Sequence, residues 1–363
     1  MFKHRNVIDD LEIYVPGRPI EDVKREFGLS RVIKLASNEN PYGFSPKARE
    51  AAAAWFDSAA VYPDGNCTVL RGALSKKFNT PPEHFVFGAG ADEIIAMLGK
   101  AFINEGDECV TAEITFSQYA AAVLSMGGKM VYAPMNADYG HNLDAVAARI
   151  TDKTRLVFIA NPNNPTGMIH TEAEQADFMK KVPSGCIVIF DEAYAEFADR
   201  PDYPDTRAML KQYNNIVYMK TFSKVYGLAS FRVGYAIAAP EIVGLLEKIR
   251  CPFNVSGAAQ VAAAEAIMDD EFTQVSIAKN KLVKEFALKK FDGLGISYLP
   301  TQANFVMINV KKHSNTVFTE LMKRGYIIRS GAAFGMDEYI RVTFGTMEQM
   351  AGFVEALENV LGV

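Results

Sequence analysis

The sequence predicts an α/β fold with a large, mostly parallel sheet and a second, smaller α+β domain. Residues 155–160 and 186–190 are almost wholly apolar, which is typical of strands buried on both faces of a parallel sheet. A loop of polar and turn-forming residues follows each strand, at the end where open α/β sheets bind ligands. The 363 residues are too many for one small core and suit one large domain or two unequal ones.

Residues 1–36 are expected to form an N-terminal arm that belongs to the smaller domain. Within it, a short helix is predicted over residues 19–27 and a strand over 31–36. The next segment, SNENPYG at 37–43, contains too many turn formers for regular structure, so we expect its side chains to reach into a cleft. A serine and a proline then begin a helix that runs over 45–55.

The large domain is predicted to span residues 37–245, with strands and helices in alternation. Its strands are expected at residues 85–87, 108–112, 129–133, 155–160, 186–190, 216–219 and 233–239. After the helix at 45–55, further helices are expected over 68–77, 114–124, 144–150 and 241–250. One more is expected to follow the glycines at 88 and 90 and to end near 102.

The rest of the smaller domain is predicted over residues 246–363. Two helices, at 257–268 and 272–291, connect it to the large domain. A compact α+β unit follows, with strands at 296–299, 305–310, 326–329 and 339–343 and helices at 314–324 and 347–361.

Composition and charge exclude several classes of function. The net charge of −5 comes with no basic stripe, so nucleic acid is not expected as a partner. The N-terminus lacks the apolar core of a signal peptide, and no apolar run reaches the ~18 residues that span a bilayer. The four cysteines lie far apart and the five histidines have no metal-ligand spacing. We therefore expect a cytoplasmic protein without disulfides, metal or membrane contact.

One segment, between the strands at 216–219 and 233–239, carries the groups most suited to chemistry. It contains Thr221, Ser223, Lys224 and Arg232. A single lysine in a turn is usually solvated. However, a lysine directly after a strand, in apolar surroundings, can lose its proton and become a nucleophilic amine. The two hydroxyls and the guanidinium beside it are suited to binding a phosphate.

This segment resembles a known family. TFSK, followed by Arg232, resembles the lysine segment of pyridoxal-phosphate (PLP) aminotransferases of fold type I, and TFSKVYGLASFRVGYAIAAP resembles the histidinol-phosphate aminotransferase group. The resemblance implies that Lys224 binds PLP as a Schiff base, and that Thr221, Ser223 and Arg232 hold its phosphate. It covers nearly the whole chain and implies a seven-stranded, mostly parallel sheet and a homodimer.

A glycine loop, Gly88 to Gly90, precedes the helix that ends near 102. Backbone N–H groups of such a loop can bind an anion. The full dinucleotide pattern G-x-G-x-x-G is absent, because Glu93 stands where the third glycine would be. The family resemblance implies that the loop holds the PLP phosphate through the N–H groups of Ala91 and Asp92. Many members of the family have serine at position 91, so this site would depend more on backbone donors.

Four residues are implied to contact the PLP ring. ANPNNPTG comes at the end of the strand at 155–160, and its Asn164 matches the asparagine that donates to the PLP 3′-oxygen in the family. Tyr194 resembles the family's tyrosine that is bonded to the same oxygen. Asp191 ends the strand at 186–190. A strand-end aspartate by itself is more often a helix N-cap, but a carboxylate there loses hydration unless it faces a cation, and the protonated PLP ring nitrogen is that cation. Phe116 would be a core residue on its own, and by resemblance it stacks on the ring.

Substrate contacts come from other parts of the chain. Arg329 and Arg341 lie in short apolar strands, where an arginine usually points to water. The resemblance implies instead that Arg341 binds a substrate carboxylate, and that Arg329 and Tyr14 help to hold a phosphate. Asn38, in the 37–43 segment, is a further candidate for substrate binding. Tyr62, in the turn YPDG, is implied to cross a dimer interface to the partner's PLP phosphate, although a surface tyrosine is the simpler interpretation.

The implied activity is that of a PLP-dependent transaminase, with Lys224, Asp191 and Tyr194 as catalytic residues. The amino donor would be histidinol phosphate and the acceptor 2-oxoglutarate, as in histidine biosynthesis. An aromatic amino-acid aminotransferase would use the same residues, and a PLP-dependent phosphothreonine decarboxylase has a closely similar chain. A non-catalytic nucleotide-binding protein is a further alternative. The sequence leaves the preferred amino donor open.

Overall fold

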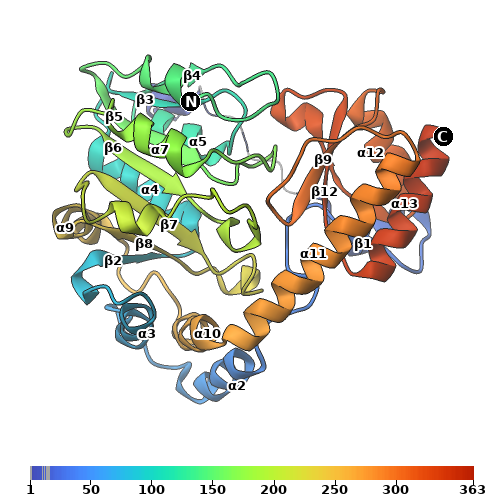
Figure 1. Cartoon of the computed structure of the whole chain (residues 1–363). Coiled ribbons are helices and arrows are strands. Elements are labelled where there is room, and N and C mark those ends of the chain that lie inside the picture. The colour runs from blue at the N-terminus through green and yellow to red at the C-terminus, as the bar shows by residue number, and fades with distance from the viewer. Residues whose placement is uncertain (1, 10, 12, 14–16) are drawn as a thin grey trace.

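The computed structural model describes residues 2–9, 11, 13 and 17–363, and its largest element is a seven-stranded sheet (Figure 1). The strand order is β2-β8-β7-β6-β5-β3-β4. β8 pairs antiparallel with β2 and β7, and the remaining neighbours are parallel, as the sequence predicts. The strands are β2 (Phe85–Gly88), β3 (Glu108–Ala112), β4 (Lys129–Ala133), β5 (Thr154–Ala160), β6 (Ile187–Asp191), β7 (Ile216–Thr221) and β8 (Gly234–Ala238).

Both faces of this sheet are covered by helices. Along β5, Leu156 and Phe158 pack in one cluster with α4 and α5, while Val157 and Ile159 pack in another with α6 and α7. This alternation follows from the two-residue period of a strand, and burial on both faces explains why the strand is apolar throughout. The helices in this part of the chain are α2 (Pro46–Trp55), α3 (Thr68–Phe78), α4 (Ala91–Phe102), α5 (Gln118–Leu124), α6 (Leu143–Ala147), α7 (Glu172–Met179), α8 (Thr206–Met209), α9 (Pro240–Ile249) and α10 (Gly257–Met268).

A second group of elements comes mainly from the carboxyl-terminal part of the chain. Helix α11 (Asp270–Gly293) runs from α10 to this group and packs there against α13 (Figure 1). A three-stranded antiparallel sheet has the order β11-β12-β9, and β1 pairs in parallel with β10 in a separate two-stranded sheet. The elements are β1 (Ile33–Lys34), β9 (Phe305–Asn309), α12 (Ser314–Lys323), β10 (Tyr326–Ile327), β11 (Arg329–Ser330), β12 (Tyr339–Thr343) and α13 (Met347–Leu361).

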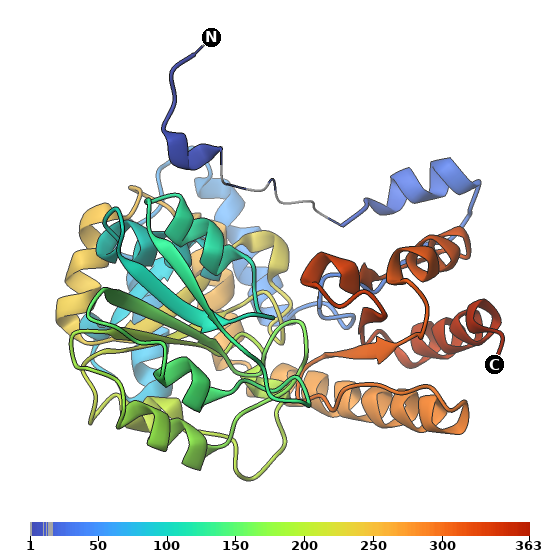
Figure 2. The ribbon, with the colours of Figure 1, turned by 90° about the horizontal axis from the view of Figure 1, so that it is seen from above.

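The N-terminal helix α1 (Ile20–Phe27) packs on this second group rather than on the large sheet (Figure 2). Its buried Val23 lies in one cluster with Met322 and Ile327. Both ends of the chain therefore contribute to the smaller part, while the predicted domain boundaries at 37 and 245 stay a prediction. Short 3-10 helices lie at Asn6–Ile8, Phe56–Ser58, Pro82–His84, Ala195–Phe197, Ala229–Phe231 and Gly331–Phe334.

Three predicted elements differ in the structure. No strand forms over 296–299, where Tyr298 makes only an isolated bridge to Ile308. The strand predicted at 326–329 divides into β10 and β11, which pair in different sheets, so Ile328 lies between two ladders. The helix predicted from 114 begins only at Gln118, because Ile114–Ser117 form the loop beside the site described below. Periodicity alone does not show where pairing with a distant strand stops.

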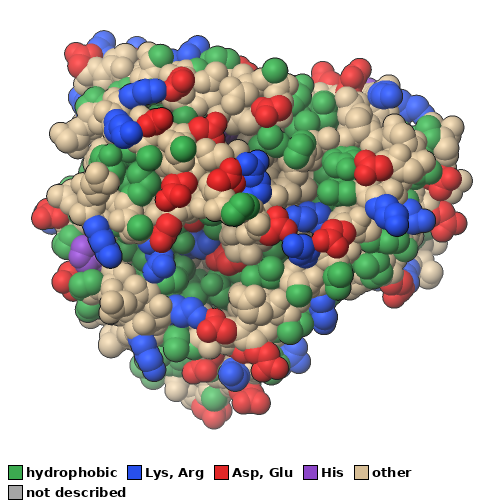
Figure 3. Space-filling view, viewed as in Figure 1, with side chains coloured by type: hydrophobic (Ala, Val, Ile, Leu, Met, Phe, Trp, Pro, Cys, Tyr) green, Lys and Arg blue, Asp and Glu red, His purple; other side chains and the backbone are tan. Residues whose placement is uncertain are grey.

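The surface mixes both signs of charge. On the face seen in Figure 3, Lys and Arg side chains are interspersed with Asp and Glu. Within the described ranges, no helix is both long and apolar enough to cross a membrane. The same residues contain no cluster of three or more His, Cys, Asp or Glu side chains that could hold a metal ion. All four cysteines are free thiols.

Candidate active site

Three predicted site residues lie at one edge of the large sheet. β5, β6 and β7 are parallel neighbours, so their carboxyl ends meet at the same edge. Asp191 is the last residue of β6, and its Cα partners are Ala160 at the end of β5 and Met219 in β7. Asn164 follows β5 and Lys224 follows β7 within a few residues. The sheet therefore brings an amide, a carboxylate and an amine together.

Asp191 is a buried carboxylate with two hydrogen-bond donors. The hydroxyl of Tyr119 donates to Oδ2 at 2.7 Å, and the backbone N–H of Ala193 donates to Oδ1 at 3.2 Å. Burial raises the pKa of Asp191 to about 6, against the opposing effects of the Tyr119 hydrogen bond and the positive charge of Lys220. The 3-10 helix that follows has Tyr194, not Asp191, as its N-cap. A carboxylate held this way is stabilised by a cation placed opposite it.

Lys224 is half-buried and contacts the N-terminal segment. Its Nζ donates to the backbone oxygen of Ser37 at 3.1 Å and lies 5.4 Å from the centre of the Tyr194 ring. The Tyr194 hydroxyl accepts a hydrogen bond from Asn38 Nδ2 at 3.0 Å. Asn38 is buried in the left-handed region at φ 57°, a conformation that asparagine tolerates better than most residues. The 37–43 segment thus reaches Lys224 through the backbone of Ser37 and Tyr194 through the side chain of Asn38.

A group of hydrogen-bonding side chains lies close to this lysine in the chain. Thr221 Oγ1 donates to Ser223 Oγ at 3.0 Å, and Arg232 donates to the same Ser223 oxygen at 3.3 Å. Arg232 also binds the carboxylate of Asp92 at 3.0 Å, which brings it to the first turn of α4. A Cβ at Gly90, where φ is 81°, would overlap the Arg232 guanidinium, so this close approach requires glycine.

The beginning of α4 completes that group. Helix α4 begins at Ala91, and its N-cap Gly90 supplies no side-chain hydrogen bond. The first N–H groups of a helix have no partner within the helix, and together with the helix dipole they favour an anion. The structure therefore brings Thr221, Ser223 and Arg232 close to the first turn of α4, which contains Ala91 and Asp92.

Three aromatic rings near Asp191 contact one another in a row. Phe116, which is half-buried, meets Tyr119 edge-on with ring centres 5.6 Å apart. Tyr119 in turn stacks on Phe158 at 4.5 Å with nearly parallel rings. Phe116 therefore contacts the ring of Tyr119, whose hydroxyl donates to Asp191.

The small antiparallel sheet supplies the two arginines. Arg341 is buried and donates through Nη1 to Asn164 Oδ1 and through Nη2 to the backbone oxygen of Ala36, the latter at 2.7 Å. Arg329 is its Cα partner across the β11–β12 pair, and residues directly opposite in an antiparallel pair share a face of the sheet. The two arginines thus lie on one face of the small sheet, and Arg341 reaches Asn164. The predicted Tyr14 lies outside the described residues.

Comparison with known proteins identifies the family. The model for the family Aminotransferase class I and II matches residues 30–357. The chain belongs to this family. It is 44% identical over 360 residues to the histidinol-phosphate aminotransferase of Moorella thermoacetica, covering 99% of this chain and 93% of that protein. It is 45% identical over 349 residues to that of Halalkalibacterium halodurans, covering 96% and 94%. Within the family, the chain therefore belongs to the histidinol-phosphate aminotransferase group.

Solved structures of this family show the same fold. Histidinol-phosphate aminotransferase from Sinorhizobium meliloti, in complex with pyridoxal-5′-phosphate, matches with a TM-score of 0.91 and 25% identity, over 100% of this chain and 98% of that one. Aspartate aminotransferase from Thermus thermophilus matches with a TM-score of 0.87 at 18% identity, over 99% and 100%, which shows the fold alone. The aminotransferase described here therefore has fold type I, as the sequence predicts.

Tyr62 is not part of the buried group around Asp191 in this single chain. Its side chain is 79% exposed and stacks on Phe253, with ring centres 4.8 Å apart and an interplanar angle of 20°. The neighbouring Val61 is also exposed.

Sequence reasoning missed several partners in this site. The sequence does not link Tyr119 to Asp191, although Tyr119 lies three residues after Phe116 and a buried tyrosine needs a partner for its hydroxyl. Lys220 and Glu196 form a buried ion pair at 2.7 Å, and the lysine's charge acts on Asp191. The carbonyl of Ser37 carries no side-chain signal at all. Such contacts depend on which distant segments meet.

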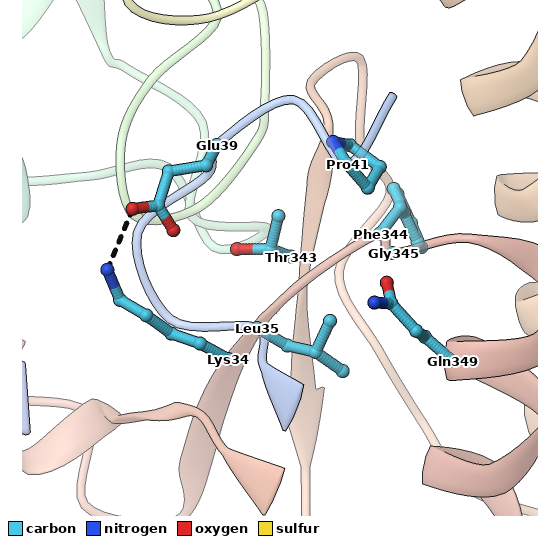
Figure 4. A pocket seen from close by; sticks show the side chains of 8 residues that line it. All are labelled: Lys34, Leu35, Glu39, Pro41, Thr343, Phe344, Gly345 and Gln349. Carbon is cyan, nitrogen blue, oxygen red and sulfur yellow. Dashed lines mark hydrogen bonds and ion pairs between the residues drawn. The ribbon is translucent and has the colours of Figure 1, made fainter. Parts of the chain in front are cut away.

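A small cavity lies next to the Asn38 segment, close to the end of β12 (Figure 4). Its volume is about 90 Å³, and an ion pair of 2.7 Å between Lys34 and Glu39 lies along its rim. Sites for small molecules usually measure about 300–1,000 Å³. This cavity is therefore too small for an aminotransferase substrate.

Proposed function

We propose that this aminotransferase uses PLP to transfer the amino group of histidinol phosphate to 2-oxoglutarate. The products would be 3-(imidazol-4-yl)-2-oxopropyl phosphate and glutamate, a step of histidine biosynthesis. The observation that carries this substrate is the cross-strand pair of Arg329 and Arg341, with Arg341 bonded to Asn164 at the edge of the large sheet. The 44% identity to histidinol-phosphate aminotransferases supports it over the full length of the chain.

The residues present fit PLP in three ways. Lys224 supplies a primary amine for covalent attachment, beside the carboxylate-bearing end of β6. Thr221, Ser223 and Arg232 stand with the start of α4 where the phosphate would bind. Asp191 is a buried carboxylate whose raised pKa calls for a cation, and the protonated ring nitrogen of PLP would supply one.

When bound, PLP supplies the electron sink that stabilises a carbanion at the substrate Cα. Lys224 is proposed to remove the proton from this Cα and to return a proton at the C4′ carbon, acting as base and then as acid. Its Nζ donates to the backbone oxygen of Ser37, which limits its orientations. Asp191, fixed by Tyr119, keeps the ring nitrogen protonated.

The remaining ring contacts are assigned in the same way. Asn164 and Tyr194 are proposed to donate to the 3′-oxygen of the cofactor, and Phe116 to cover one face of the ring. Ala91 and Asp92 would offer backbone N–H groups to the phosphate. Since Arg341 already bonds Asn164, a substrate held by Arg341 would lie directly beside the ring.

The substrate phosphate is assigned to the two arginines. Like charges directly opposite in a β-ladder are unfavourable by themselves, and a bound anion would offset this cost. A dianionic phosphate can accept several charge-assisted hydrogen bonds of ~1.5–3 kcal/mol each, from Arg329 and Arg341 together with Tyr14 and Asn38. An aromatic amino acid has only one carboxylate and needs only one arginine. The arginine pair therefore favours histidinol phosphate over an aromatic amino donor.

The working unit is proposed to be a cytoplasmic homodimer. The support is the exposed stack of Tyr62 on Phe253, since Tyr62 would complete the phosphate site only by reaching into a partner subunit. Small amino donors and 2-oxo acids are the remaining partners, and neither nucleic acid nor membrane is proposed.

A half-reaction screen tests the proposal. The PLP-loaded enzyme is mixed separately with histidinol phosphate, phenylalanine and phosphothreonine, and the absorbance of the bound cofactor is followed. We expect histidinol phosphate to convert the cofactor to its amine form fastest, with the 2-oxo phosphate released. Faster conversion by phenylalanine would favour an aromatic aminotransferase. Release of CO2 from phosphothreonine, without conversion by the other amines, would show a decarboxylase.

A further inference from the structure

A single amide bridges both ends of the loop that precedes α4. Asn254 lies between α9 and α10, far from this loop in sequence. Its Nδ2 donates to the backbone oxygen of Phe87 in β2 at 3.0 Å, and to the carboxylate of Glu93 in the first turn of α4 at 2.7 Å. The loop between these two residues carries Gly88, Ala89 and Gly90. One side chain therefore fixes the distance between the end of the strand and the beginning of the helix.

Glu93 also forms a hydrogen bond to the backbone within the same loop. Its Oε2 accepts a hydrogen bond from the backbone N–H of Ala89 at 2.6 Å, in addition to the one from Asn254. This bond occupies the N–H of Ala89 and leaves the first N–H groups of α4, at Ala91 and Asp92, as the donors for an anion. A carboxylate beside an anion site is unfavourable, so its presence calls for a structural role.

The orientation of Asn254 is fixed by a chain of charged groups. Arg250 donates to Asn254 Oδ1 at 2.9 Å, and because a guanidinium only donates, the amide must present its Nδ2 to the loop. Arg250 is bound to Glu247 at 2.7 Å, and Glu247 to Arg71 at 3.3 Å. The charges of Arg250 and Arg71 cancel those of Glu247 and Glu93. This hydrogen-bonded network therefore orients Asn254 without attracting or repelling an anion through a net charge.

The residue before Asn254 joins this arrangement to the surface. Phe253 has a φ of 57°, in the left-handed region that is unfavourable for a bulky residue, and it stacks on Tyr62. Gln260 donates to the backbone oxygens of Asp64 and Val255, at 2.9 and 3.0 Å, which ties the Tyr62 turn to the same segment. Strain at Phe253 is kept because the surrounding contacts require it.

We propose that Asn254 is a positioning residue for the cofactor phosphate, which it serves by holding the Phe87–Glu93 loop together with Glu93. This rests on the proposed function, since it assumes that the loop binds the phosphate of PLP. Donors that are already in place bind an anion without the cost of ordering the loop. Without the Asn254 amide, Glu93 and the loop would lose their common partner, and the N–H groups of Ala91 and Asp92 would be less well aimed.

The test compares PLP with pyridoxal, which lacks the phosphate. Full-length enzyme is freed of cofactor, and the dissociation constants of both compounds are measured by absorbance. Asn254→Ala is expected to weaken PLP about 10- to 100-fold and pyridoxal less than about 3-fold. Asn215→Ala is the matched control, because Asn215 also bonds backbone oxygens, those of Cys186 and Pro183, but at the opposite end of the sheet. It should leave both constants unchanged.

Glu93 provides the second arm, which also decides the matter if Asn254→Ala fails to fold. Glu93→Gln keeps an oxygen that can accept from Ala89 and Asn254, so PLP affinity should stay within about 3-fold of wild type. Glu93→Ala removes that acceptor and should weaken PLP as Asn254→Ala does. Hydrogen exchange at the Ala89 amide should quicken in Glu93→Ala and not in Glu93→Gln.

The outcomes separate this inference from the proposed function. If wild type binds pyridoxal as tightly as PLP, the loop does not bind a phosphate and the proposed function itself fails. If wild type prefers PLP but the Asn254 and Glu93 alanine variants keep that preference, only the positioning role is wrong. Equal loss of PLP and pyridoxal affinity would show a general structural defect and would also overturn it.

Discussion

The two sides of this candidate active site are built in different ways. On the proposed cofactor side, Asp191 ends a buried parallel strand, and Asn164 and Lys224 follow two neighbouring strands within a few residues. On the substrate side, Arg329 and Arg341 lie in short antiparallel strands of a small sheet. The first side takes its geometry from a sheet packed on both faces, and the second from pairings between distant parts of the chain.

The join between the two sides is a small set of hydrogen bonds. Asn38 and Thr343, 305 residues apart, exchange two hydrogen bonds of 2.9 Å each, and Arg341 reaches the Ala36 carbonyl. The Asn38 amide then bonds Tyr194 at the sheet edge. A rigid cofactor side can perform the same chemistry on many amines, whereas the substrate side can be changed without disturbing it. The comparison therefore predicts that chemistry and specificity respond to different substitutions.

The strongest way to break the cofactor side is Lys224→Ala. It removes the attachment point of PLP and the proton carrier together, so kcat is expected to fall by at least about 10⁴-fold. PLP should still bind, through its phosphate, but should no longer be fixed by borohydride. In wild type, borohydride reduction and peptide mapping should find the pyridoxyl group on Lys224. Label on a different lysine would refute the assignment.

Asp191→Asn should have the next largest effect. The amide cannot keep the ring nitrogen protonated, so kcat is expected to fall by about 10²- to 10⁴-fold while PLP stays bound. Tyr119→Phe, which leaves the carboxylate but removes its hydroxyl donor, serves as the comparison and should cost less. Steady-state rates with saturating cofactor give both numbers. Turnover close to wild type in Asp191→Asn would mean that this carboxylate has only a structural role.

Arg329→Ala tests the substrate side. Loss of one arginine of the proposed phosphate site should raise the activation free energy that corresponds to kcat/KM for histidinol phosphate by roughly 2–4 kcal/mol. Phenylalanine, which has no phosphate, should be affected much less, and kcat for the cofactor-side chemistry should change little. Rates with both amines in wild type and variant measure this. Equal damage to the two substrates would show that Arg329 does not read the phosphate.

Thr343→Val tests the join. Valine keeps the shape but leaves the N–H and Oδ1 of buried Asn38 without their partner, which should lower the free energy of unfolding by about 1–3 kcal/mol. Because Asn38 bonds Tyr194, KM should rise more than kcat falls. Urea unfolding measures the change in the free energy of unfolding, and steady-state kinetics measure the changes in KM and kcat. Unchanged stability would mean that the two sides are not joined here.

The smallest expected effect is a pH dependence of the cofactor-free enzyme. The pKa of Asp191 is raised to about 6, so between its ordinary value near 3.8 and 6 the folded state binds more protons than the unfolded state. Stability from this group is therefore present at low pH and falls as pH rises to about 6, by up to about 1–3 kcal/mol. Asp191→Asn should lack this fall. Parallel stability curves for wild type and variant between pH 4 and 7 would contradict the assigned pKa.

The same comparison explains what could be predicted from the sequence. On the proposed cofactor side, each residue lies at or just after the end of its own apolar strand, so the sequence could predict that Asn164, Asp191 and Lys224 meet at one edge of the sheet. Their roles come from the family resemblance and stay a prediction. On the substrate side, the sequence indicated the arginines but not that Arg329 and Arg341 are cross-strand partners. Residues 296–299 look like a strand yet form one bridge, because pairing depends on the neighbour. Tyr119 and Asn254 act through partners that only the fold brings near.

The most direct test of the whole account is the substrate preference of the unaltered enzyme. The value of kcat/KM is measured for histidinol phosphate, for histidinol, which lacks only the phosphate, and for phenylalanine, with 2-oxoglutarate as acceptor. Two arginines that read a phosphate should make histidinol phosphate better than histidinol by at least about 100-fold, and better than phenylalanine as well. Equal values for histidinol phosphate and histidinol, or a preference for phenylalanine, would contradict the account.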